Sequence, residues 1–188
     1  MKIVGLSGSI VGSKTRTAMD YIAKELTENY TEADFTLIDL ANYELPFSDG
    51  RNYLEYQGDA AFVARALMEA EVIIIGTPIF HASIPGVLKN VFDLLPENAF
   101  RDKVIGLYVT AGSAKHYLVV EQQLKPILSY MKANTVATYV FMEEKDFHLK
   151  SIVNDDIYFR LARLIEDTIQ LAKAKDITRK EKEQAYDF

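Results

Sequence analysis

The sequence predicts an α/β fold built on a doubly wound parallel sheet, and two observations support this. Five short runs rich in Val and Ile recur along the chain, at residues 2–6, 35–40, 72–76, 104–110 and 135–141. These runs are apolar throughout instead of alternating, which is typical of strands covered on both faces. Segments with helical spacing separate them, and this alternation favours a parallel sheet with helices on both sides.

The segments between the strands have the apolar spacing of amphipathic helices. They cover residues 17–26, 59–70, 87–95, 121–132 and 155–174. In the second segment the spacing predicts that Phe62, Ala66 and Leu67 share the buried face. Pro126 predicts a kink or a late start of the fourth helix, and Asp155 is the candidate N-cap of the last one.

Composition narrows the class of protein. The 188 residues suit a single domain, and the net charge of −6 does not fit a nucleic-acid-binding surface. The chain has no cysteine, so disulfides and thiolate chemistry are excluded. With no signal peptide or membrane-spanning run in the sequence, we expect a cytoplasmic protein that contacts no membrane. The charged end of the chain, from about residue 176 to 188, predicts a solvated or frayed helix end.

The stretch Gly8–Thr15, GSIVGSKT, follows the first predicted strand. A nucleoside triphosphate loop needs Gly-Lys-Ser/Thr without a gap, but here Ser13 separates Gly12 from Lys14. The dinucleotide pattern G-x-G-x-x-G is not met either. Hydroxyls and backbone N–H groups at a helix N-terminus suit a phosphomonoester, whereas a Ser-rich turn without a ligand fits the same residues. This loop alone leaves both interpretations open.

The loop after the third predicted strand carries the most specific pattern in the chain. From Gly76 it reads GTPIFHASIPGVLKNVFDLL. Pro85 suits the first turn of the helix that follows, because the missing N–H costs nothing there. The loop offers a series of backbone amides with one aromatic ring, Phe80, and one imidazole, His81. Such a loop can flank a flat ring.

This loop resembles that of the NADPH-dependent FMN reductase family, which includes small azoreductases and quinone reductases. The family pattern is roughly G-[ST]-P-x-[YF]-[NH]-x-S-x-P-G-x-L-K-N-x-x-D. The matching residues are Gly76, Thr77, Pro78, Phe80, His81, Ser83, Pro85, Gly86, Leu88, Lys89, Asn90 and Asp93. The resemblance covers residues 2 to about 142. It implies a flavodoxin-like three-layer sandwich over residues 1–188, with a five-stranded parallel sheet in the order 2-1-3-4-5.

The resemblance implies that Gly8–Thr15 is the FMN phosphate loop. The family usually has Arg where this chain has Val11, so Lys14 or Arg16 is the candidate replacement for that cation. A shift of one residue brings the hydroxyls of Ser13 and Thr15 into register with the family pattern. A third loop, Thr110–Tyr117, follows the fourth strand. In this family a loop of small residues here lies along the edge of the flavin ring, although an ordinary strand-to-helix turn fits it as well.

The candidate cofactor-binding residues come from these three loops. They are Ser7, Ser9, Ser13, Lys14, Thr15, Pro78, Ile79, Phe80, His81, Ser83, Thr110, Ala111, Gly112 and Ser113. We assign no catalytic side chain and no metal ligand, because hydride transfer to a flavin needs the protein chiefly to position the two reactants. His81 is therefore expected to line the flavin site. In this family, Lys89, Asn90 and Asp93 more often serve structure and subunit packing.

The resemblance implies an enzyme that binds FMN and uses NAD(P)H as co-substrate. Hydride would pass from NAD(P)H to FMN and then to an acceptor such as a flavin, a quinone or an azo compound. A homodimer or homotetramer is expected, with no nucleic-acid partner. The alternative is a flavodoxin-type electron carrier without its own nicotinamide site, and a kinase or ATPase is a more distant one.

Overall fold

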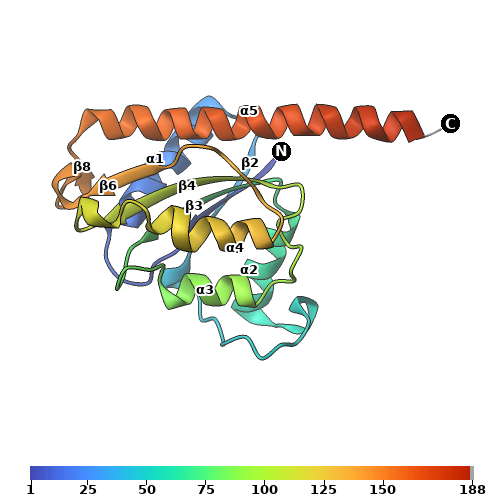
Figure 1. Ribbon diagram of the computed structural model, residues 1–188, viewed down its shortest axis with the longest axis horizontal. Helices are drawn as coiled ribbons and strands as arrows, with labels where there is room; N and C mark the ends of the chain where they lie inside the picture. The colour runs from blue at the N-terminus through green and yellow to red at the C-terminus, as the bar shows by residue number, and fades with distance from the viewer. Residues whose placement is uncertain (187–188) are drawn as a thin grey trace.

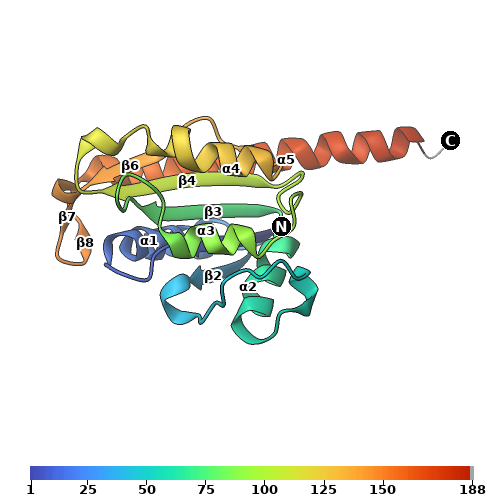
Figure 2. The ribbon, with the colours of Figure 1, turned by 60° about the horizontal axis from the view of Figure 1, so that its bottom comes forward.

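The structure, a computed structural model that describes residues 1–186, is an α/β sandwich around a parallel sheet (Figure 1). Strands β1 (Lys2–Ser7), β2 (Asp34–Asp39), β3 (Val72–Pro78) and β4 (Val104–Ala111) lie side by side, with β5 (Asn134–Thr135) beyond β4. The strand order is β2-β1-β3-β4-β5, as predicted. In Figure 2 the strands β2, β3 and β4 follow one another in this order across the sheet. The central strands β3 and β4 are buried along their whole length, because helices cover both faces.

The fifth predicted strand differs from the expectation. Residues 135–141 do not form one strand; β5 is followed by a separate strand, β6 (Val140–Glu143), and both pair with β4 in parallel. The interruption spans residues 136–139, where Val136 and Tyr139 remain buried. Ala137 and Thr138 in this interruption are exposed, so the apolar run predicted burial only in part and did not require a continuous ladder of hydrogen bonds.

Two helices cover one face of the sheet and three cover the other. Helix α1 (Lys14–Asn29) packs beside α5 (Asp155–Tyr186), and α2 (Gly58–Glu69), α3 (Gly86–Asp93) and α4 (Lys125–Tyr130) form the opposite layer. Each layer has its own apolar core against the sheet. Figure 1 shows that the end of α5 projects beyond the sheet. The charged end of the chain is helical up to Tyr186, and residues 177–184 are exposed; residues 187–188 lie outside the described part of the chain.

Two details of the helices correct the sequence prediction. In α2 the buried residues are Ala60, Val63, Ala64 and Leu67, whereas Phe62 is 46% exposed and stacks on Tyr43 instead. Helix α5 begins at Asp155, but Asn154 caps it, because its Oδ1 accepts a hydrogen bond of 3.2 Å from the N–H of Asp156.

The segment around Pro126 confirms a late helix start. A π-helix, η4 (Val120–Leu124), precedes α4, and Pro126 lies in the first turn of α4, where its missing N–H is tolerated. Four short 3-10 turns lie in the loops: η1 (Leu40–Asn42), η2 (Tyr53–Glu55), η3 (Ala114–His116) and η5 (Glu144–Asp146). A small antiparallel pair, β7 (Phe147–His148) and β8 (Ser151–Ile152), leads into α5. Among residues 1–186, no helix is long and apolar enough to cross a bilayer.

Candidate functional site

The three predicted loops meet at the carboxyl edge of the sheet. Ser7 ends β1, Pro78 ends β3 and Ala111 ends β4, and these strands are neighbours in the sheet. Direct contacts join the loops. The Gly8 N–H donates to the Gly76 carbonyl at 2.7 Å, and the Ile79 N–H donates to the Thr110 carbonyl at 3.1 Å. Ligands bind at this edge in open α/β sheets, where the strand order reverses.

The loop of residues 8–15, the predicted phosphate loop, presents backbone N–H groups that have no partner among residues 1–186. Within the described residues, the N–H groups of Ser9, Ile10, Gly12 and Ser13 donate to no other group. Gly12 has a φ of +83°, a left-handed conformation that glycine adopts without strain. Helix α1 starts at the end of this loop, and its first N–H groups are unpaired as in any helix. The loop therefore has the donors and the helix dipole that an anion needs.

The hydroxyls of the loop differ in their surroundings. Ser9 Oγ donates to the Val11 carbonyl at 2.6 Å and accepts from the Val11 N–H at 3.2 Å, which fixes the bend of the loop. The Ser13 side chain makes no capping hydrogen bond and stays available. Thr15 is buried, and its Oγ1 lies 2.8 Å from Thr110 Oγ1, so these two predicted residues join the first and third loops.

The two cations near the loop point to different partners. The Arg16 guanidinium is held at 2.7 Å by Asp20 and at 2.7 Å by Asp39, the residue that ends β2. The hydrogen bond that Arg16 donates to Asp20 is the main cause of a raised pKa for Arg16, so its guanidinium stays charged. The Lys14 ammonium instead pairs with the carboxylate of Glu144, an exposed side chain just after β6. Lys14 is the more available of the two, since its single partner is exposed.

The second loop forms a tight turn. Phe80 and Ser83 exchange backbone hydrogen bonds of 2.9 and 3.0 Å, and the two residues between them, His81 and Ala82, have φ of +49° and +60°. This is the geometry of a type I′ turn, which normally has Asn or Gly in the middle. Backbone strain of this kind is concentrated at ligand-binding sites. The N–H groups of His81 and Ala82 donate to nothing within the described residues, and both residues are exposed.

The third loop leaves β4 at Ala111 and passes through Gly112 and Ser113 into η3. Ser113 Oγ accepts a hydrogen bond of 3.3 Å from the Lys115 N–H and so caps this short turn. Gly112 is exposed, and a side chain there would meet no other atom. The loop thus lies open beside Ile79, whose N–H is bonded to Thr110. A flat ring can approach both backbones from this side.

Three residues that matter to this site were not predicted from the sequence. Tyr108 is fully buried beneath the loops, and its hydroxyl donates to the Thr15 carbonyl. Glu144 holds Lys14. Lys150 lies close to the phosphate loop, in the turn between β7 and β8. One signal was available for Tyr108, because it stands opposite Gly76 in the register of β3 and β4, and a bulky ring needs a glycine beside it.

Asn90, a residue of the family pattern, has a structural role. Its Nδ2 donates to the Pro46 carbonyl at 2.9 Å and its Oδ1 accepts from the Ser48 N–H at 3.0 Å. It thereby fastens the long loop of residues 41–58 to α3. Lys89 and Asp93 form an ion pair on the exposed side of the same helix.

Comparison with known proteins shows the family of this chain. A family model described as NADPH-dependent FMN reductase matches residues 1–148. The chain is 37% identical over 172 residues to an NAD(P)H-dependent FAD/FMN reductase of Geobacillus thermodenitrificans (strain NG80-2), an alignment that covers 91% of this chain and 93% of that protein.

Solved structures show the same fold. The apo form of the NADH:FMN oxidoreductase EMOB superposes with a TM-score of 0.72 and 28% identity, covering 88% of this chain and 86% of that one. Flavodoxin 1 of Bacillus cereus superposes with a TM-score of 0.64 over 90% of this chain and 98% of that one. At 16% sequence identity, this similarity concerns the fold alone. The sandwich is therefore flavodoxin-like, as predicted. The chain belongs to the NADPH-dependent FMN reductase family and is an FMN-dependent NAD(P)H oxidoreductase.

Proposed function

We propose that this enzyme holds FMN with its phosphate in the loop of residues 8–15 and its ring between the second and third loops. The observation that carries this assignment is the set of unpaired backbone N–H groups at Ser9, Ile10, Gly12 and Ser13. Ser9 is buried and Ser13 is half-buried, and such donors without a partner are rare in folded proteins. Ile10 and Gly12 are exposed, so their N–H groups are open to an anion at the helix N-terminus. The residues present therefore fit the phosphate of FMN.

Side chains of the same loop complete the phosphate site. Ser13 has a hydroxyl without a capping bond, and Ser9 shapes the loop through its bonds to Val11. Lys14 supplies the cation that the family usually draws from an arginine, because Arg16 is already held by Asp20 and Asp39. Binding of a phosphate would draw the Lys14 ammonium away from Glu144.

The ring of FMN would lie against backbone groups. The turn at His81 and Ala82 presents its free N–H groups on one side, and the loop at Gly112 and Ser113 borders the other. Bound FMN supplies the chemistry, accepting hydride from NAD(P)H and passing it to an acceptor. The N–H groups near the pyrimidine edge would stabilise negative charge on the reduced ring. No side chain of this chain needs to move a proton.

The acceptor, the assembly and the location of the enzyme belong to the same proposal. A free flavin is the acceptor that we favour, with quinones and azo compounds also admissible. Exposed apolar side chains beside the open loops, such as Phe80 at 39% and Leu118 at 55%, support a homodimer or homotetramer in which a second copy covers the ring. We further propose one cytoplasmic domain spanning residues 1–188.

The test of this function is spectroscopic. The purified chain is titrated with FMN, and the FMN complex is then mixed anaerobically with NADH or NADPH in a stopped-flow instrument. We expect saturable binding and rapid loss of the visible flavin band. Saturable binding without bleaching would leave a flavodoxin-type electron carrier and overturn the reductase. Binding of ATP with magnesium in place of FMN would overturn the flavin site itself.

A further inference from the structure

Helix α5 presents a stripe of exposed side chains along one face. Its members follow one another at intervals of four and three residues in turn: Phe159, Arg163, Glu166, Gln170, Lys173 and Ile177. Phe159 is 69% exposed and Ile177 is 58% exposed, although both are large and apolar. Such spacing is typical of a helix face that packs along a second helix. The opposite face of α5 is buried against the sheet, so the stripe points away from the core.

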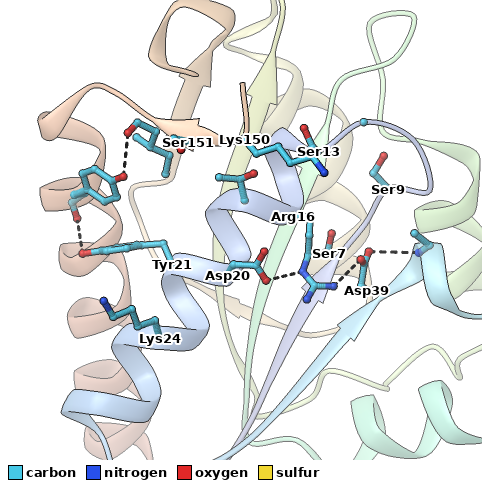
Figure 3. Close-up of a pocket in the computed structure, with 15 residues that line it drawn as sticks. Ser7, Ser9, Ser13, Arg16, Asp20, Tyr21, Lys24, Asp39, Lys150 and Ser151 are labelled. Atoms are coloured by element: carbon cyan, nitrogen blue, oxygen red, sulfur yellow. Dashed lines mark hydrogen bonds and ion pairs between the residues drawn. The ribbon is translucent and has the colours of Figure 1, made fainter. Parts of the chain in front are cut away.

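A groove of about 400 Å³ runs beside the first half of the stripe, between α5 and the end of α1. Glu25 lines one wall, and Phe159 and Glu166 line the other. The two helices are held together nearby, because the rings of Tyr21 and Tyr158 meet edge to face with centroids 4.8 Å apart. Figure 3 shows Tyr21 extending from α1 toward α5. The groove is therefore formed before any partner arrives.

The tail of α5, residues 173–184, extends beyond the sheet (Figure 1, Figure 2). Residues 177–184 are exposed on every side of the helix. The tail has five basic and three acidic side chains, although the whole chain has a net charge of −6. Most helical stability in proteins comes from packing of one face, so a projecting helix of this length gains from a partner. A groove with Glu25 and Glu166 on its walls has the complementary charge.

Two charges on the stripe have no ion-pair partner among residues 1–186. Glu166 accepts a hydrogen bond of 2.9 Å from Gln170, one turn along, and Lys173 forms no ion pair. By contrast, Lys180 pairs with Asp176 at 2.6 Å within the helix. Glu166 and Lys173 have opposite charges but stand two turns apart, so they cannot meet within one helix. Two copies of α5 that run in opposite directions bring them together.

We propose that α5 pairs antiparallel with α5 of a second copy of this chain, about a two-fold axis beside Gln170, and that each tail lies in the groove of the other copy. The two-fold makes the contact self-complementary, since Glu166 of each copy meets Lys173 of the other. Each body of the protein packs beneath the first half of its own α5, and the tail of the other copy lies above it. The projection of the tails beyond the sheet therefore leaves room for both bodies.

The same register matches the rest of the stripe. Ile177 of the second copy faces Ala162, whose small side chain lines the groove. Lys180 of the second copy faces the exposed ring of Phe159, over which an ammonium group is attracted. This contact lies in the layer of α1 and α5, opposite α3 and α4. It is thus separate from the proposed contact that covers the flavin ring, and together the two contacts would join four copies.

The first test is a disulfide cross-link, which is specific because the chain has no cysteine of its own. Gln170→Cys should form a linked dimer under mild copper-catalysed air oxidation, since the two residues face each other beside the axis. Lys182→Cys, also exposed on α5, is the matched control. Its two copies would stand roughly 40 Å apart, beyond the reach of a disulfide. Gln170→Cys should therefore link at least about 5-fold faster than the control.

The second test exchanges charges and measures the dissociation constant of self-association by sedimentation over a range of protein concentrations. Glu166→Lys and Lys173→Glu should each weaken association by about 10-fold, because two exposed ion pairs become two repulsions. The double variant should recover the affinity to within about 3-fold. The two positions do not touch within one helix, so this recovery can come only from contact between copies.

Three results would overturn the proposal. They are a chain that stays monomeric at every concentration, equal cross-linking of Gln170→Cys and Lys182→Cys, and a double charge variant that associates as weakly as the single ones. FMN titration of the same variants separates this contact from the flavin site. The affinity for FMN should change less than about 2-fold, since the stripe lies on the outer face of α5, away from the three loops.

Discussion

The hydroxyl of Tyr108 donates a hydrogen bond of 2.6 Å to the backbone carbonyl of Thr15. Tyr108 lies in β4 and Thr15 in the first turn of α1, so this bond fixes the phosphate loop to the strand that carries the third loop. A β-carbon at Gly76 would lie 2.0 Å from the Tyr108 ring, so only glycine there leaves room for it. Burial raises the pKa of this tyrosine well above its ordinary value, so the hydroxyl stays a donor.

Tyr108→Phe should lower the free energy of unfolding by about 1 kcal/mol, because a buried hydrogen bond is lost while the ring still fills its place. FMN affinity should fall with it, since the start of α1 is less firmly held. Chemical denaturation and FMN titration measure the two effects. Tyr130→Phe removes a hydroxyl bonded to Glu97 on the surface and serves as the control. Unchanged stability and FMN affinity in Tyr108→Phe would contradict the role given to this bond.

Because Lys14 and Glu144 form an ion pair, we expect substitutions of these two residues to change FMN binding in opposite directions. Lys14→Gln should weaken binding by about 10-fold through loss of a charged contact to phosphate. Glu144→Gln should strengthen binding by about 2- to 3-fold, because it releases Lys14 from an exposed ion pair of small net value. Titration with FMN at low salt measures both. Lys145→Gln, an exposed neighbour paired with Glu143, is the control, and weaker binding in Glu144→Gln would refute the assignment.

The turn at Ala82 predicts a gain in stability. A left-handed conformation costs an L-residue roughly 1–2 kcal/mol, and glycine avoids this strain. Glycine also loses more conformational entropy on folding, which offsets about 0.5–1 kcal/mol of the gain. Ala82→Gly should therefore raise the free energy of unfolding by up to about 1 kcal/mol. Ala61→Gly, inside α2, should lower it by about 0.5–1 kcal/mol and provides the comparison. A loss of stability in Ala82→Gly would show that its methyl group, and not the backbone, determines the turn.

The raised pKa of Tyr21 leads us to expect that the folding stability of the protein falls at high pH. Burial and the nearby Glu25 raise the pKa of Tyr21 to about 12, above the value near 10 of an unfolded tyrosine. The stability that this shift contributes is fully present below pH 10 and is lost as the pH rises through 12. Tyr21→Phe should therefore have a shallower fall in stability between pH 10 and 12. Denaturant midpoints across that window measure it, and an identical slope in both proteins would contradict the prediction.

Local pattern was enough to predict most of the fold. Continuous apolar runs located β1 to β4, helical spacing located the five helices, and Pro126 marked the late start of α4. The pattern failed where apolar residues can be buried in more than one way. Phe62 stacks on an aromatic neighbour and stays partly exposed. The run of residues 135–141 is buried only in part, with Ala137 and Thr138 exposed, and does not form one strand.

By itself, the sequence determined the family, the order of the strands and the three loops that meet at their carboxyl ends. The tertiary structure decided which cation is available, because Arg16 meets Asp39, 23 residues away along the chain, while Lys14 meets Glu144. It also placed Tyr108 beneath the phosphate loop and Lys150 beside it. Such pairings depend on distances in the folded chain, and no local spacing of residues encodes those distances.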